Sequence, residues 1–186
     1  MPTFLDDIYP FKLVDDNPEH FKYNFVSKGQ KDITKRVSIR LCEFPDYNKY
    51  FYLEFGNITF NAQNEEKVCD MTRDNNKGDA GKVLKTVFAC AFQYFSTFSD
   101  SILAFYGNTS AKHRLYKGLI NKNLSELQTF FIIKGGIITD LELIETIEYG
   151  KEPKEVDPKD IIYQLYDPQH SMKYSFITFE LKDEFK

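Results

Sequence analysis

A stripe of apolar residues in the middle of the chain predicts a long amphipathic helix. Between residues 83 and 98, apolar side chains recur every three or four positions, while Lys85 and Gln93 fall between them. This spacing gathers the apolar side chains on one face of a helix with 3.6 residues per turn. Asp79 is suited to cap the helix, because its carboxylate can accept an amide hydrogen bond from the first turn. We therefore expect a helix that starts after Asp79 and ends near residues 98–100.

A short buried strand and a second helix are expected next. Residues 102–106 form an uninterrupted apolar run, which is typical of a strand covered on both faces. Thr109 or Ser110 can cap the helix that follows. The expected apolar face of this helix comprises Ala111, Leu115, Tyr116, Leu119 and Ile120, and its other faces carry Lys112, His113, Arg114 and Lys117 as a solvated basic surface.

Alternating apolar and polar residues predict an antiparallel meander in the first third of the chain. Residues 3–17 suit an edge strand or a packed arm, and residues 21–26, 35–44 and 50–55 each favour a strand. Residues 45–49 connect the last two of these as in a hairpin. Gly56-Asn57 suits a turn before a short run at 58–60.

The remainder of the chain predicts further strands with few helical residues. Residues 68–71, 130–133 and 174–181 favour strands, Gly135-Gly136 suits a turn, and 137–149 favours a strand over a helix because it is rich in β-branched residues. Residues 151–159 suggest a charged loop, and Asp157-Pro158 can start a short helix through residue 166. We therefore expect an α+β fold, with a mixed, largely antiparallel sheet and two main helices packed on it, in a single globular domain of residues 1–186.

Composition narrows the class of protein and its location. The 186 residues are 42% hydrophobic, enough for a sizeable core, and the net charge of −4 disfavours nucleic acid as the main partner. No stretch is long enough to span a membrane and no secretion signal opens the chain, so we expect no membrane partner. Three cysteines without a CxxC spacing suit a reducing compartment, which indicates a cytoplasmic protein.

A candidate anion site involves the loop before the first helix and the start of the second. Glycines at a helix N-terminus let an anion approach free backbone amides, and neighbouring basic side chains add positive charge. A turn that merely leads to an N-cap is the alternative interpretation of this loop. The candidate ligand-binding residues are Arg73, Lys77, Gly78 and Gly81 in the loop, with Asn108, Thr109, Ser110, Arg114 and Tyr116 at the second helix.

The loop and the second helix also resemble known families. The Arg-Asp-Asn-x-x-Gly-Asp loop at residues 73–79, the Lys-Val-Leu-x-Thr-Val segment at 82–87 and the Arg-Leu-Tyr of the second helix resemble a family of uncharacterised bacterial proteins. A weaker similarity is to the GNAT acyltransferases, whose fold has this order of elements. That similarity implies acetyl-CoA as a cofactor and a pyrophosphate-binding loop; the matching positions are Arg73, Gly78, Ala80 and Gly81, with Asn108, Ala111 and Tyr116 later in the chain.

The sequence favours a binding or regulatory protein of unknown ligand. The three histidines are scattered, and no catalytic triad, metal-ligand spacing or paired acid motif stands out. The partner would be a small anionic ligand, or another protein recognised through exposed aromatic side chains. A GNAT-like N-acyltransferase is the alternative, so enzymatic activity stays open. A second alternative is a nucleotide- or nucleic-acid-binding protein that uses Arg73, Lys77, Lys112, Arg114 and Lys117.

Overall fold

The fold is α+β with nine described strands, most of them paired antiparallel, as the sequence predicts. The computed structural model describes residues 5–42, 49–69, 76–105, 110–139 and 157–186, without the side chains of residues 69 and 110–112. Contacts divide the chain into two compact units. The first unit comprises residues 1–40 and 53–98, and the second comprises residues 41–52 and 99–186.

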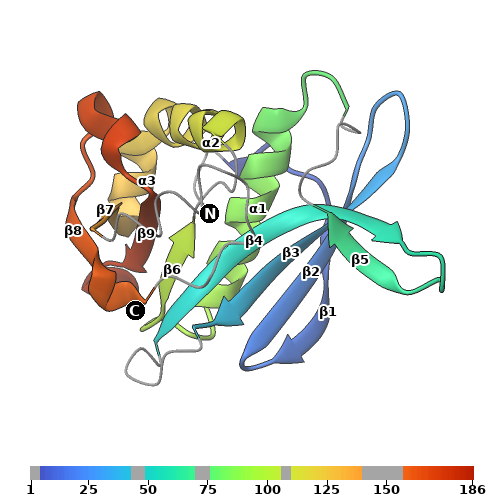
Figure 1. Ribbon diagram of the computed structural model, residues 1–186, viewed down its shortest axis with the longest axis horizontal. Helices are drawn as coiled ribbons and strands as arrows, with labels where there is room; N and C mark the ends of the chain where they lie inside the picture. Colours follow the sequence, from blue (N-terminus) through green and yellow to red (C-terminus); the bar gives the residue numbers. More distant parts are fainter. Residues whose placement is uncertain (1–4, 43–48, 70–75, 106–109, 140–156) are drawn as a thin grey trace. The chain divides into compact units, whose positions relative to one another are not determined.

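The first unit contains the predicted meander (Figure 1). Its strands lie in the order β1, β2, β3, β4, and β5 pairs with β4. Strand β2 shows why these residues form a sheet: Phe21, Tyr23 and Phe25 alternate with more exposed side chains, so that one face is buried. The strand bounds are β1 Phe11–Asn17, β2 His20–Ser27, β3 Ile33–Leu41, β4 Tyr50–Phe60 and β5 Glu66–Cys69.

Helix α1 (Ala80–Phe95) is the predicted amphipathic helix. Its apolar stripe is buried, and the ring of Tyr94 packs edge-on against Phe21 of β2 with centroids 5.2 Å apart. The helix ends at Phe95, earlier than the expected 98–100. Phe98, beyond the helix end, is partly buried, and its ring stacks on that of Tyr94 with centroids 5.1 Å apart.

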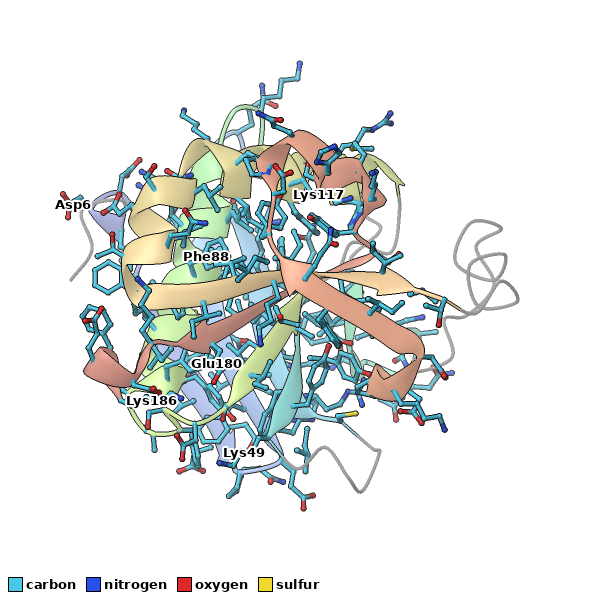
Figure 2. The ribbon with its side chains drawn as sticks, turned by 90° about the vertical axis from the view of Figure 1, so that its left-hand side faces the viewer. Asp6, Lys49, Phe88, Lys117, Glu180 and Lys186 are labelled. Carbon is cyan, nitrogen blue, oxygen red and sulfur yellow. The ribbon has the colours of Figure 1, made fainter. Side chains whose placement is uncertain are left out.

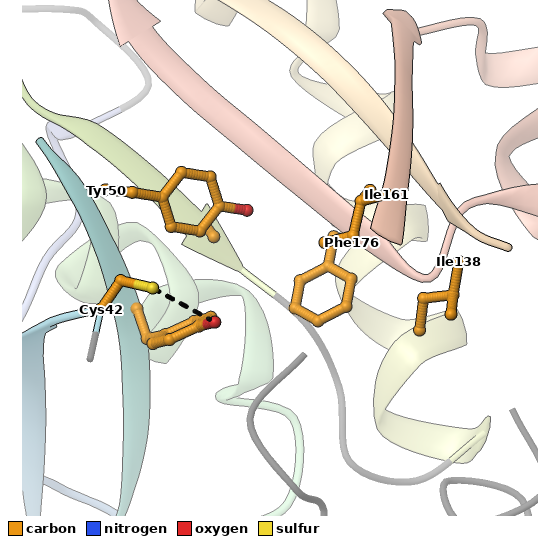
Figure 3. Close-up of a cluster of buried hydrophobic side chains, with 7 residues drawn as sticks. Cys42, Tyr50, Ile138, Ile161 and Phe176 are labelled. Carbon is orange, nitrogen blue, oxygen red and sulfur yellow. Dashed lines mark hydrogen bonds between the residues drawn. The ribbon is translucent and has the colours of Figure 1, made fainter. Parts of the chain in front are cut away.

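The second unit orders its strands β6, β9, β7, β8, and the first residues of β4 belong to it. A cluster of buried side chains fills part of its core, in which the Cys42 thiol lies 3.8 Å from the Tyr52 hydroxyl (Figure 3). The bounds are β6 Ile102–Phe105, α2 Ser110–Lys122, α3 Leu124–Phe130, β7 Phe131–Ile138, β8 Ile161–Leu165 and β9 Phe176–Leu181, with 3-10 turns η2 Pro158–Asp160, η3 Pro168–Lys173 and η4 Asp183–Phe185.

Two turns expected at glycines are wrong. Gly135-Gly136 lies inside β7, opposite Ile177 and Phe176 of β9. A Cβ atom at Gly135 would overlap the ring of Tyr174, so the glycine is needed for close packing and not for a turn. Gly56-Asn57 likewise lies within the single strand β4, whose pairing with β5 begins at Asn57.

Another segment also differs from the expectation. Residues 161–165, expected as helix, form strand β8 with Ile161 buried against β7. The 3-10 turn before β8 does begin at Pro158, and the Asp157 side chain caps it. The expected connection at 45–48, the strand at 140–149 and the loop at 151–156 lie outside the described residues.

Candidate functional site

The start of α1 is held by the Asp79 carboxylate, but not in the way the sequence predicts. Asp79 occupies the N-cap position, as expected, yet its side chain makes no capping hydrogen bond. Instead, Oδ2 accepts hydrogen bonds from the Ser27 hydroxyl at 2.5 Å and the Tyr9 hydroxyl at 3.2 Å. The buried Asn76 side chain donates to Ser27 and to the Lys31 carbonyl oxygen. The carboxylate thus ties the helix start to the end of β2.

The predicted loop residues surround this helix start. Gly78 has φ of +82°, a conformation that favours glycine, and Gly81 lies in the first turn of α1 with open space where a Cβ would be. Lys77 is exposed and precedes Gly78. Lys82 is already engaged, because its Nζ lies 2.7 Å from a carboxylate oxygen of Asp7. Arg73 lies outside the described residues.

The predicted residues of the second helix belong to the second unit. Asn108 and Thr109 lie outside the described residues; Ser110 opens α2, without a described side chain. Arg114 is exposed, whereas Tyr116 is buried with its ring 4.7 Å from that of Phe105. Tyr116 is therefore a core residue. The joint site of loop 73–82 and the 108–110 helix start, with its full set of residues, stays a prediction.

Helix α2 buries only part of the expected apolar face, together with a lysine that was expected at the surface. Leu115, predicted to be in the core, is 45% exposed, while Lys117, predicted to be solvated, is 2% exposed. Tyr116 and Ile120 complete the buried face. Successive residues are rotated by about 100° around a helix, so these three buried side chains share one side and Leu115 points away from it.

A row of polar side chains, His113, Lys117 and Asn121, follows one edge of this buried face at intervals of four residues. We call it the α2 polar row. Its two ends are bonded within the second unit. His113 Nε2 lies 2.6 Å from the Tyr174 carbonyl oxygen, and Asn121 Oδ1 accepts a hydrogen bond from the Tyr166 hydroxyl at 2.7 Å.

The middle residue of the row is Lys117 (Figure 2), whose side chain is 2% exposed. Within the described part of the chain, Lys117 Nζ has no hydrogen-bond partner. Burial lowers the pKa of Lys117 to about 8, because a charged amine loses its hydration inside the protein. Burial also lowers the pKa of His113, and the positive charge of Lys117 adds to that effect, so His113 is neutral at pH 7.

The α2 polar row can bind the acceptor atoms of a ligand. An ammonium group offers three donors and no acceptor, and burying it without a partner is costly. The prediction that Lys117 belongs to a solvated surface is therefore wrong, whereas His113 is partly buried. The i, i+4, i+8 spacing of three polar residues beside Tyr116 and Ile120 was the signal in the sequence, but the expected face at Ala111, Leu115 and Leu119 concealed it.

The protein thus has an α+β fold and a buried lysine on a helix, which has no hydrogen-bond partner among the residues that the structure describes. The chain belongs to the family described as "Family of unknown function (DUF6934)", which matches residues 6–153. This agrees with the predicted membership of an uncharacterised family, and no similarity to GNAT acyltransferases is shown. The comparisons with curated proteins and with solved structures found no match.

Two further findings concern metals and membranes. Among the described residues, no group of three or more His, Cys, Asp or Glu side chains could hold a metal ion. None of the described helices has the length and apolar character needed to cross a lipid bilayer.

Proposed function

We propose that the protein is a binding protein for a small anionic ligand, which it holds at helix α2. The observation that supports this proposal is the Lys117 ammonium group, 2% exposed and without a partner among the described side chains and backbone. An anionic oxygen would compensate the lost hydration of this charge through a charge-assisted hydrogen bond. Arg114, three residues earlier and exposed, is the second contact for the same ligand.

The other partner considered, a protein recognised through exposed aromatic side chains, receives less support. Most of the described phenylalanine and tyrosine rings are buried, and the exposed large apolar residues of the second unit include one ring, Phe185. The burial of Lys117 also removes one of the five basic residues on which nucleic-acid binding was to depend. We infer a cytoplasmic, bacterial ligand-binding protein, with the GNAT-like acyltransferase as a hypothesis that no contact among the described residues favours.

Isothermal titration calorimetry with a panel of small anions tests the proposal. The panel comprises phosphate, acetate, pyruvate and citrate. We expect at least one of them to bind, and Lys117→Met to weaken that binding at least tenfold because the charge partner is lost. Lys122→Met is the matched control, since Lys122 is an exposed lysine on the same helix and its loss should leave affinity unchanged. Absence of binding by every anion, or equal binding by both variants, would refute the proposal.

A further inference from the structure

We propose that Lys117 binds its ligand covalently, as an imine formed with the carbonyl carbon of a small 2-oxo acid. The inference rests on the proposed function, because it names the ligand class for the same site. It requires a lysine that is shielded from water, not held as an ammonium by a carboxylate, and adjacent to a group that accepts protons. The second unit meets these three requirements at one position.

The surroundings of Lys117 explain why its amine is available. Its neighbours along the row are bonded to other groups, His113 to the Tyr174 carbonyl and Asn121 to the Tyr166 hydroxyl. Asp167 caps η3, the element that packs on α2, and its carboxylate is bonded to the His170 ring at 2.6 Å.

Two other lysines of the second unit lie beside carboxylates. Lys159 Nζ lies 2.8 Å from Asp157, and Lys186 Nζ lies 3.1 Å from Asp183. The carboxylates raise the pKa of Lys186 and so favour its charged form, which has no lone pair to react. Lys117 differs from them in both burial and pairing.

The protonation equilibrium of Lys117 favours reaction with a carbonyl. An amine attacks only as the neutral form, and desolvation is a known way to make a lysine nucleophilic at neutral pH. Because the pKa of Lys117 is lowered to about 8, roughly a quarter of the amine is neutral at pH 7.5, against about one part in a thousand for an ordinary lysine.

The reaction needs no oxidant or reductant. The lone pair of Nζ forms a bond to the carbonyl carbon, the C=O π electrons move to oxygen, and oxygen takes up the proton that nitrogen releases. The resulting carbinolamine loses its hydroxyl group and the remaining nitrogen proton as water, and a C=N double bond forms. One amine and one carbonyl compound therefore give one imine and one water.

His113 is placed to accept and return the proton in this sequence. Its Nε2 faces the Tyr174 carbonyl oxygen, which can only accept a hydrogen bond, so Nε2 carries the ring proton. In the neutral ring Nδ1 is then unprotonated and can act as a base, one helical turn from Lys117.

A 2-oxo acid offers a carboxylate to the charge of Arg114 and a carbonyl carbon to the amine of Lys117. Arg114 lies beside Lys117 at a spacing of three residues and is exposed, so its guanidinium can bind a carboxylate while the adjacent carbonyl carbon reaches Lys117. A ligand with a carboxylate next to a ketone or aldehyde uses both side chains.

Reductive trapping tests this inference on the full chain. The protein is incubated with pyruvate and sodium cyanoborohydride, which converts an imine to a stable secondary amine, and the product is analysed by intact mass and peptide mapping. We expect one reduced pyruvate adduct per chain, on Lys117, forming at least tenfold faster than on any other lysine. The rate should rise with pH with a midpoint near 8. Lys117→Met should lose the adduct and Lys122→Met should keep it.

A second pair of measurements separates this inference from the proposed function. Arg114→Gln should slow trapping of pyruvate several-fold but leave trapping of propanal, which has no carboxylate, unchanged. Pyruvate binding that depends on Lys117 in calorimetry, without an adduct, would overturn the imine and leave the anion site standing. Adducts spread evenly over the lysines would also overturn it. Failure of both binding and trapping would reject the two proposals together.

Discussion

At the scale of single residues, Lys117 combines a charge with near-complete burial. The pKa of Lys117 falls from the ordinary lysine value of 10.5 to about 8 in the folded chain, which corresponds to a cost on the order of 3 kcal/mol for keeping the charged form inside. Ionisable groups with strongly shifted pKa values are concentrated at functional sites, where they act on a ligand. The buried charge should therefore lower the free energy of unfolding of the protein by a measurable amount.

Replacing Lys117 with Met should stabilise the protein at pH 7 by about 2–3 kcal/mol, because an apolar side chain of similar length removes the buried charge. The gain depends on pH in a defined direction. Below pH 8 lysine is protonated in both states and the full cost is present. Between pH 8 and 10.5 the unfolded chain holds more protons than the folded one, so the wild type becomes relatively more stable.

Denaturant unfolding of the wild type and Lys117→Met at pH 7 and pH 9.5 measures this effect. The difference between the two proteins should shrink by about 2 kcal/mol at the higher pH. Lys122→Met should show almost no difference at either pH, since the control lysine is exposed. A variant that is less stable than the wild type at pH 7 would mean that Lys117 has a stabilising partner.

Single residues of the site were also the hardest to predict from the sequence. The pattern placed Tyr116 in the core correctly, because aromatic rings dominate burial. It placed Lys117 at the surface, since buried lysines are rare and periodicity counts only apolar residues. The sequence predicts that the Asp79 side chain caps α1. In the structure it accepts hydrogen bonds from Ser27 and Tyr9, which lie 52 and 70 residues away in the chain. Local spacing cannot reveal contacts of that kind.

At the scale of helices and strands, the sequence was more informative. Helix α1 and strands β2 and β6 were found near their observed positions, because strong periodicity or a continuous apolar run marks them. Two of the errors lie where a glycine is interpreted as a turn. Gly135 sits in β7 to make room for Tyr174, which lies 39 residues further along the chain. Tertiary packing overrode the local preference there.

Two glycine substitutions on regular elements should therefore have opposite effects. Gly135→Ala should destabilise the protein by about 1–3 kcal/mol, because the new methyl group overlaps the buried ring of Tyr174. Gly118→Ala, at an exposed position of α2, should stabilise it by about 0.5–1 kcal/mol, because alanine favours a helix and no atom lies near the added Cβ.

Thermal unfolding of the wild type and of both glycine variants compares their stabilities. Adding Tyr174→Leu to Gly135→Ala offers a check on the mechanism, since a smaller side chain should relieve part of the overlap and the two changes should not be additive. Equal effects of Gly135→Ala and Gly118→Ala would show that the Tyr174 ring moves aside freely.

At the scale of the whole molecule, the family match and the structural units end at different places. The match stops at residue 153, whereas the second unit continues to residue 186. Strand β9, which follows the match, pairs with β6 through Leu103 and with β7 through Ile133, in both cases opposite Phe179. The bonding partners of the α2 polar row, Tyr166 and Tyr174, also lie beyond residue 153.

A chain that ends at residue 153 should therefore fail to form the second unit. Its sheet would lose the strand between β6 and β7, and the buried rings of Tyr174, Phe176 and Phe179 would be absent. An unpaired strand edge and a missing part of the core cannot be compensated by residues 99–139 alone. We expect hydrogen exchange, followed by mass spectrometry, to show loss of amide protection in β6, β7 and α2.

A chain that lacks only residues 183–186 is the matched control, because it removes η4 and keeps β9 whole. It should retain protection in β6 and β7, with a modest loss of stability from the Phe185 ring that packs on Phe130. If the chain ending at residue 153 kept full protection in β6 and β7, the matched segment would be a self-sufficient fold. The α2 polar row would then keep its geometry without Tyr166 and Tyr174. The ligand proposals would then require other hydrogen-bond partners that position His113 and Asn121.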